Sequence, residues 1–240
     1  MKQQLVNEEE NGWKPNAFCG IVTLGSIEPP MNRIVKVLMS TMTVAAIASL
    51  FGRQWYILAL GAGIAGVITS CLFGNVTLQV CGLTPTEAIA GLSEKKNRMI
   101  ALLPLVFIFA EVWIGIHFFE DYIYQALSVL NRQLIFSGSA TLALYVLLLT
   151  VVEEVPWRCF YQLNIGRNFP AAFALILPAA GMTLLALPLY HNGASILCLL
   201  GFFARRVAWG YLYVESGSMI IVILSHWLAT LLYLILLVGV

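Results

Sequence analysis

Long apolar stretches separated by short polar segments make up most of the chain after residue 34. Each stretch is near the ~20 residues that a helix needs to cross the hydrocarbon core of a bilayer. We therefore predict an all-α fold, a polytopic transmembrane helix bundle of about seven or eight spans. The predicted spans are residues 37–51, 55–73, 99–119, 134–152, 169–190, 194–213 and 218–240.

The first 34 residues differ from the rest because they are polar and mixed in charge. Glu8, Glu9 and Glu10 are consecutive, and Pro29-Pro30 interrupts the chain before the first apolar stretch. The order of a secretory signal, a basic start followed by a short apolar region, is missing. We predict that residues 1–34 are a polar cytoplasmic segment and that residues 35–240 are one membrane-embedded helical domain.

The polar loops differ in the sign of their charge. Glu120 and Asp121 make one loop acidic, whereas two other loops are basic. Basic loops stay preferentially in the cytoplasm, so we place these two loops and the N-terminus on that side. The basic residues are Lys95, Lys96 and Arg98 in the longest internal loop, and Arg158 and Arg167 in the other.

Composition supports the membrane class and limits the possible partners. Hydrophobic residues are 60% of the chain and charged residues only 10%, far from the composition of a soluble domain. The net charge of +1 and the scattered Lys and Arg give no basic face, so we expect no nucleic-acid partner. The five cysteines form no CxxC pair, and we predict no disulfide framework, no zinc site and no cofactor.

The loop before residue 99 contains a pattern typical of a helix start. Thr84 is followed by Pro85 and, three residues after Thr84, by Glu87. This order fits a capping box with Pro at the first helical position, so we predict a short interfacial helix here. A plain connecting loop with a turn is the alternative.

Two adjacent glutamates and an arginine lie directly after the predicted span 134–152. Charge is costly at such a place, so it points to a functional site. On a helix Glu154 and Arg158 share a face, while Glu153 is rotated by roughly 100°. We predict that Arg158 holds Glu154 ionised and that Glu153 faces a cavity as a desolvated base.

Pro156 cannot donate to the Val152 carbonyl, which predicts a kink or a helix end. The alternative is that the charges cap the span and reach water.

Other polar residues fall within or at the ends of spans. His191 and His226 are candidates for the same site, although a histidine in a span is often a hydrogen-bonding partner of another helix. Arg205 and Arg206 interrupt the span 194–213, and we favour their reaching an interface over one of them receiving a substrate carboxylate. We assign no role to Glu111.

These residues resemble the CPBP group, the glutamate-type intramembrane endopeptidases also called the Abi or type II CAAX prenyl endopeptidase family. Its EExxxR motif is matched in full by Glu153, Glu154 and Arg158. Its FxxxH motif is similar to Leu187 to His191, with leucine for phenylalanine. Its HxxxN/D motif is similar to His226 to Thr230, with threonine for the amide or acid. The resemblance covers residues 143–235.

The resemblance implies hydrolysis of a peptide bond by a glutamate-activated water, without a metal. Glu153 would be the general base, His191 would position the water, and His226 with Thr230 would stabilise the oxyanion. Thr230 offers one short hydroxyl where an amide would reach farther, which puts this last role in doubt. The expected partners are the lipid bilayer and a membrane-anchored peptide or protein, prenylated or carrying a leader. The expected location is the bacterial inner membrane.

Two other functions stay open at this point. One is a non-proteolytic membrane scaffold or bacteriocin self-immunity protein of the same family, which the Thr230 departure favours. The other is a metal-binding or proton-coupled transporter that uses the same Glu and His side chains as ligands. Transport is the weakest alternative because no duplicated, Gly/Pro-interrupted halves are visible.

Overall fold

The computed structural model describes residues 32–52, 54–72, 81–118, 139–187 and 196–238, and these ranges contain helices and no strand. Asn32 begins the first helix, because its side chain accepts a hydrogen bond from the Ile34 backbone N–H. The elements are α2 (Arg33–Ala48) with the 3₁₀ turn η1 (Ser49–Phe51), α3 (Gln54–Leu72), α4 (Pro85–Ser93), α5 (Lys95–Phe118), α7 (Ser139–Val155), the π-helix η2 (Pro156–Gln162), α8 (Leu163–Asn168), α9 (Ala171–Ala186), α10 (Ile196–Ser216) and α11 (Met219–Val238).

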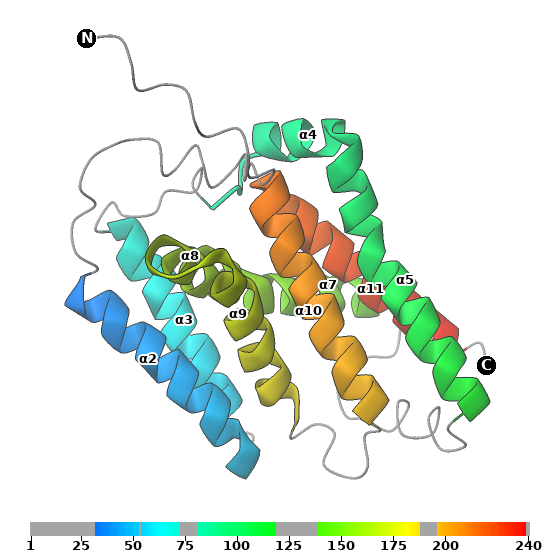
Figure 1. The fold of residues 1–240 in the computed structure, drawn as a ribbon, viewed down its shortest axis with the longest axis horizontal. Helices are drawn as coiled ribbons and strands as arrows, with labels where there is room; N and C mark the ends of the chain where they lie inside the picture. Colours follow the sequence, from blue (N-terminus) through cyan, green and yellow to red (C-terminus); the bar gives the residue numbers. More distant parts are fainter. Residues whose placement is uncertain (1–31, 53, 73–80, 119–138, 188–195, 239–240) are drawn as a thin grey trace.

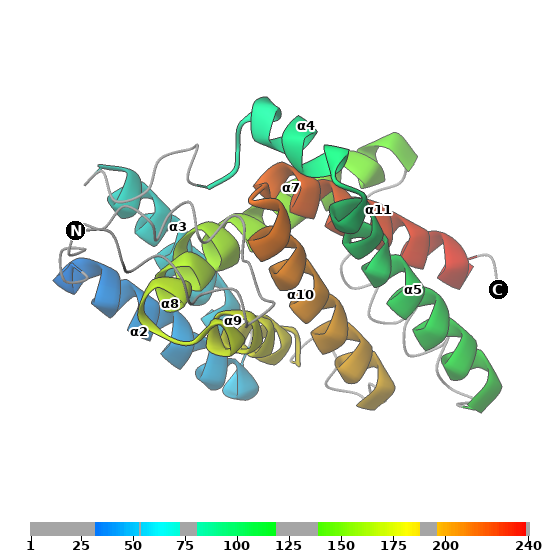
Figure 2. The same cartoon turned by 45° about the horizontal axis from the view of Figure 1, so that its top comes forward.

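The helices form a bundle in which one long helix runs through the middle. Figure 1 shows α2 and α3 side by side at one edge and α5 at the other, with α9 and α10 between them. In Figure 2 the helix made of α7, η2 and α8 passes from α11 to α2 and α3. The short helix α4 lies across the ends of α5, α10 and α11. This arrangement brings residues of α3, α7, α10 and α11 to one central region.

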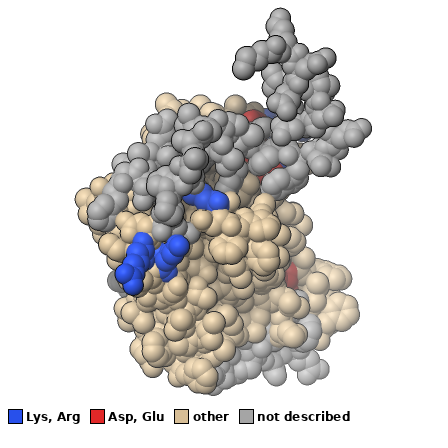
Figure 3. All heavy atoms as spheres, turned by 60° about the vertical axis from the view of Figure 1, so that its left-hand side comes forward, with Lys and Arg blue, Asp and Glu red and all other residues tan. Residues whose placement is uncertain are grey.

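The outer surface of the bundle is suited to lipid. Large apolar side chains such as Phe51, Leu72 and Ile235 are exposed. Figure 3 shows a face on the α2 side where most of the described surface carries no charge. Five described helices are long and apolar enough to cross a membrane: Arg33–Phe51, Gln54–Leu72, Lys95–Phe118, Ala140–Asn168 and Met219–Leu237. The prediction of an all-α integral membrane protein is confirmed.

The two remaining predicted spans are also helices, but they are less typical of membrane spans. The predicted span 169–190 is α9, which is shorter and starts after Pro170. The predicted span 194–213 is α10, which carries Arg205, Arg206 and Glu215. The seven predicted spans thus each correspond to a helix, and five of them meet the length and hydropathy expected of a span.

The glutamate-bearing helix does not end at Pro156. Because proline has no N–H to donate, the regular α-helical ladder is interrupted there, as predicted. The chain continues as a π-helix through Gln162, a wider turn that accommodates the missing hydrogen bond. The seven residues of η2 are all buried. Arg158 therefore lies in the protein interior, and its assignment to a basic loop was wrong.

Two glycines of α3 let this helix approach η2 closely. A Cβ on Gly63 would lie 2.5 Å from the Pro156 Cβ, and one on Gly66 would lie 2.5 Å from the Phe160 ring. By contrast, a Cβ on Gly61 would meet nothing within 4 Å. The close approach holds α3, and with it Tyr56, against the helix that carries the glutamates.

The short helix α4 starts at Pro85 as predicted, but the capping box does not form. Thr84 has the extended backbone of an N-cap and no side-chain capping bond. Its hydroxyl lies 3.2 Å from that of Thr86. Within the described residues, Oε2 of Glu87 has no hydrogen-bond partner. The predicted helix is confirmed, whereas the predicted reciprocal bonds were wrong because the neighbouring threonine competes for the cap hydroxyl.

Candidate active site

Glu154 and Arg158 form the fully buried centre of the site. The Arg158 Nε donates to Glu154 Oε2 at 2.8 Å, and both side chains are 0% exposed. Arg158 also donates to Gln162 Oε1 at 3.0 Å and to the Arg206 backbone carbonyl at 2.9 Å. The predicted contact between Glu154 and Arg158, one turn apart on one helix, is confirmed. The donation from Arg158 to the Arg206 carbonyl connects the central helix to α10.

Arg206 of α10 joins the two glutamates. Its Nη2 lies 2.6 Å from Glu153 Oε2, and its Nη1 lies 2.7 Å from Glu154 Oε1. The guanidinium also lies over the rings of Phe202 and Trp209, 4.5 and 5.4 Å from their centroids. The preferred prediction, that this arginine reaches an interface, was wrong, because α10 packs beside the carboxylates and supplies their counter-charge inside the bundle.

Glu153 and Glu154 have different surroundings. Glu153 is 24% exposed, whereas Glu154 is completely buried. Besides Arg206, Glu153 accepts a hydrogen bond from the Tyr56 hydroxyl of α3 at 3.0 Å. The two carboxylates therefore cannot act alike: Glu154 is enclosed by protein groups, and Glu153 is the one that an incoming molecule can reach.

His226 of α11 completes the described cluster. Its Nδ1 lies 2.9 Å from Glu154 Oε1, so a protonated Nδ1 donates to that carboxylate. The imidazole packs on the Trp209 ring with 3.9 Å between centroids. The structure thus brings His226 together with Glu153, Glu154 and Arg158, the residues that the sequence pattern selected.

Unlike His226, Thr230 and His191 are not shown in contact with the glutamates by the described part of the structure. The Thr230 hydroxyl donates to the His226 backbone carbonyl at 3.0 Å, one turn earlier on the same helix. Leu187 follows the last residue of α9, but His191 lies outside the described residues. The roles of both residues toward a substrate stay predictions.

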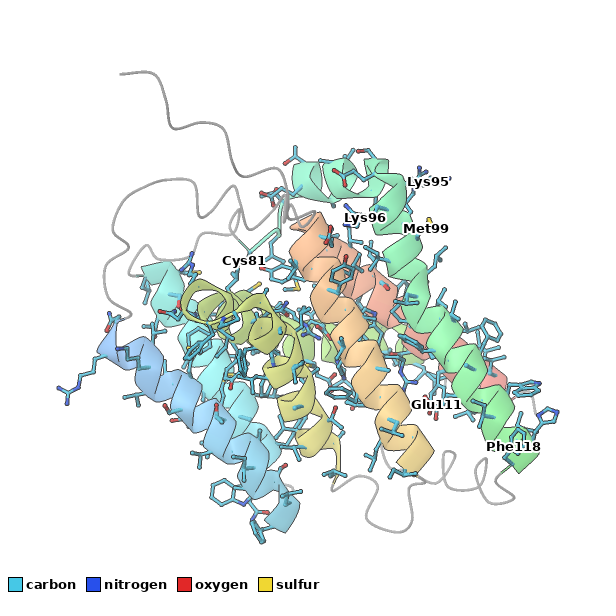
Figure 4. All side chains as sticks on the ribbon, in the orientation of Figure 1. Cys81, Lys95, Lys96, Met99, Glu111 and Phe118 are labelled. Carbon is cyan, nitrogen blue, oxygen red and sulfur yellow. The ribbon has the colours of Figure 1, made fainter. Side chains whose placement is uncertain are left out.

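A second buried ion pair lies apart from the site. Glu111 of α5 contacts Arg205 of α10, and Tyr233 of α11 donates to Glu111 Oε1 at 3.3 Å. Figure 4 labels Glu111 toward the end of α5 that is remote from Lys95. Arg205 also lies 5.4 Å from the centre of the Tyr233 ring. This pair gives Glu111 a structural role that links three helices, and it corrects the prediction that Arg205 reaches an interface.

The sequence did not reveal two members of the site. Tyr56 lies in an apolar stretch like many others, and no pattern distinguished it. Arg206 was conspicuous as a charge within a span, but its partners are 53 and 52 positions away along the chain. Only the packing of α10 against the glutamate-bearing helix shows that Arg206 belongs to the cluster.

The charges of the cluster balance. Two carboxylates face two guanidiniums, and the imidazole is within hydrogen-bond distance of one carboxylate. Among the described residues no group of three or more His, Cys, Asp or Glu side chains could hold a metal ion. Such an arrangement suits a reaction in which a carboxylate accepts a proton inside the protein and nearby donors stabilise the negative charge that develops.

Comparison with known proteins identifies the family. Residues 104–232, more than half of the chain, match the family of type II CAAX prenyl endopeptidase Rce1-like proteins. The chain belongs to this family. The match includes every residue of the cluster except Tyr56, and it confirms the resemblance drawn from the EExxxR motif. Neither the curated proteins nor the solved structures give a match. The protein is accordingly an integral membrane member of a protease family.

Proposed function

We propose that this Rce1-like protein is an intramembrane endopeptidase that hydrolyses a peptide bond of a membrane-anchored substrate through a glutamate-activated water. The observation that carries the proposal is the unequal burial of the two glutamates. Glu153 is partly exposed beside an enclosed, charge-balanced cluster, which is the position that a general base for an incoming water needs.

Besides the water and the substrate peptide, the proposed reaction uses only side chains of this protein. Glu153 takes a proton from the water, whose oxygen bonds to the carbonyl carbon of the scissile peptide. The carbonyl π electrons move to oxygen and give a tetrahedral oxyanion. When the oxyanion collapses, the C–N bond breaks, and the amine leaves with the proton that Glu153 returns. His191 would position the water, and His226 would act on the oxyanion, as the family resemblance implies.

Glu154 and Arg158 serve as positioning residues in this proposal. Glu154 accepts from Arg158, Arg206 and His226, so it fixes the orientation of three side chains from three elements. Its complete burial keeps water from it. Fixed dipoles and charges that need no rearrangement during the reaction are the most effective way to stabilise a transition state.

The membrane setting supports a substrate that is itself anchored in the bilayer. The described bundle exposes apolar side chains to its surroundings, which supports access of a membrane-anchored substrate along the bilayer. A prenylated C-terminal peptide and a leader-bearing precursor are the two candidates, both anchored in the bilayer. A bacterial inner membrane is the proposed location.

A non-proteolytic scaffold or self-immunity protein is the second candidate. One observation favours it: the Thr230 hydroxyl is engaged with the backbone of its own helix, where the family pattern has a longer amide or acid. If no other group stabilises the oxyanion, the protein would keep the fold of the family but would not hydrolyse a peptide bond.

Cleavage assays on purified, reconstituted protein separate the two candidates. Prenylated CAAX peptides and leader-type peptides are incubated with the wild type and with Glu153→Gln and His191→Ala variants. Glu94→Gln is the matched control, since it makes the same change at an exposed carboxylate. We expect cleavage by the wild type and the control, and none by the other two. An inactive wild type whose cellular phenotype survives both substitutions would favour the scaffold.

A further inference from the structure

Arg206 has one buried donor without an acceptor in the described part of the chain. Its Nε is buried and lacks a hydrogen-bond partner among the described residues, although the two Nη atoms hold Glu153 and Glu154. A buried N–H without an acceptor is unfavourable, and such a group in a native protein calls for an explanation. The unpartnered atom belongs to the residue at the centre of the proposed site.

The geometry of the guanidinium limits what Nε can bind. The group is planar and rigid, so Nε–H projects beside the Nη atoms that contact the glutamates. Each Nη carries two N–H groups, and each Nη holds one carboxylate. A single oxygen atom requires only one donor, which Nε–H supplies. The arrangement therefore fits a single carbonyl oxygen next to Glu153.

The reaction needs such a donor at this place. Thr230, the residue expected to help with the oxyanion, donates to the His226 carbonyl. When Glu153 accepts the proton of the water, it loses its negative charge, and the substrate oxygen gains one. The negative charge thus moves from one neighbour of Arg206 to another. A guanidinium between the two positions stabilises both states without moving.

We propose that Arg206 is a catalytic residue: its Nε–H donates to the scissile carbonyl oxygen as that oxygen becomes negatively charged, while its Nη atoms hold Glu153 and Glu154. This role rests on the proposed peptidase function. No bond to Arg206 forms or breaks, and the guanidinium keeps its protons throughout. The residue takes over the part for which Thr230 is poorly placed.

An Arg206→Lys variant tests the role, with Arg205→Lys as the matched control. Lysine keeps the positive charge near the two glutamates but lacks the Nε–H and the planar fork. The control makes the same change one residue away, in a buried ion pair with Glu111 outside the site. Loss of one oxyanion donor typically lowers kcat by roughly 10²–10³-fold. We expect that loss in kcat for Arg206→Lys with KM little changed, and an unchanged kcat for Arg205→Lys in the folded fraction.

A binding measurement keeps the test independent of the folding of the variant. A phosphinate peptide, which mimics the tetrahedral intermediate, is added to wild-type protein labelled with ¹⁵N at arginine side chains. We expect one Nε–H signal to shift strongly downfield, and no such shift with the product peptide. Arg206→Lys should weaken phosphinate binding by the same factor as kcat/KM.

The outcomes separate this proposal from the function on which it rests. Cleavage by the wild type with normal kcat in Arg206→Lys, or with no shifted Nε–H signal, overturns the role of Arg206 and leaves the peptidase standing. A wild type that neither cleaves the peptides nor binds the phosphinate overturns both.

Discussion

At the scale of single residues, the site is a set of charges that stabilise one another in the protein interior. Arg158 and Glu154 have no contact with solvent, so neither can be compensated by water if its partner is removed. Burying a charge without a partner costs much more than the pair contributes when it is intact. The cluster therefore makes each member sensitive to the loss of another.

Arg158→Ala should lower the free energy of unfolding by about 3–5 kcal/mol, because it removes one of the two guanidiniums that contact the fully buried Glu154 carboxylate. Unfolding by denaturant in mixed micelles, followed by tryptophan fluorescence, measures the change. Lys96→Ala is the contrast. It breaks an ion pair with Glu215 in which the lysine is 56% exposed, so the loss should be at most about 1 kcal/mol. Equal losses for the two variants would contradict the prediction.

Cleavage should be insensitive to chelators. Glu153 and Glu154 are already neutralised by Arg158 and Arg206, and a divalent cation among these groups would face two guanidiniums at close range. Activity with and without EDTA and 1,10-phenanthroline is the measurement. Inhibition that added Zn²⁺ reverses would show instead that a metal takes part.

From the sequence, contacts within the site could be predicted only between residues of the same helix. The spacing of Glu154 and Arg158 determines their contact, because residues four apart share a helix face. Arg206 and Tyr56 come from other helices, and their positions depend on which helices are neighbours. The same reason explains why the pair of Glu111 and Arg205 was missed.

At the scale of elements, the close packing of α3 against η2 is the contact that most depends on small residues. The absence of a side chain at Gly66 makes room for the Phe160 ring, which is completely buried. Overpacking of a filled interior forces side chains and backbone to move.

Gly66→Ala should therefore destabilise the protein by about 1–3 kcal/mol. Gly61→Ala, on the same helix, meets nothing within 4 Å and should be neutral or slightly stabilising, because alanine favours the helix. Thermal unfolding of the two variants beside the wild type measures the difference. The interpretation fails if Gly61→Ala is as destabilising as Gly66→Ala.

The elements were more predictable than their ends. Apolar length identified the spans, since the bilayer fixes how many residues a helix needs. Pro156 predicted an interrupted hydrogen-bond ladder, but whether the chain stops or widens depends on the packing around it. The predicted capping bond of the Thr84 side chain does not form, because the Thr86 hydroxyl competes for it.

At the scale of the whole molecule, the axis of α5 relates the structure to the membrane. Its 24 residues correspond to a length of about 36 Å, enough to cross the hydrocarbon core. Figure 4 shows Lys95 and Lys96 at one end and Phe118 at the other. The basic end adjoins α4, which lies across the bundle.

A single cysteine at Lys95 should be labelled only from the cytoplasmic side, and one at His117 only from the opposite side. Both side chains are exposed, so access to the reagent does not differ. The measurement uses a membrane-impermeant maleimide on right-side-out and inverted vesicles, with the native cysteines replaced. The opposite pattern would reverse the predicted orientation.

The π-helix has a consequence for the variation that the chain can tolerate. A helix on the outside of a bundle accepts substitutions on its outer side, so tolerated positions recur about every three to four residues. All residues of Pro156–Gln162 are buried, with α3, α7, α9 and α10 packed around them. A saturation mutagenesis survey should therefore find seven consecutive positions that tolerate no substitution, because no face of this helical segment is exposed.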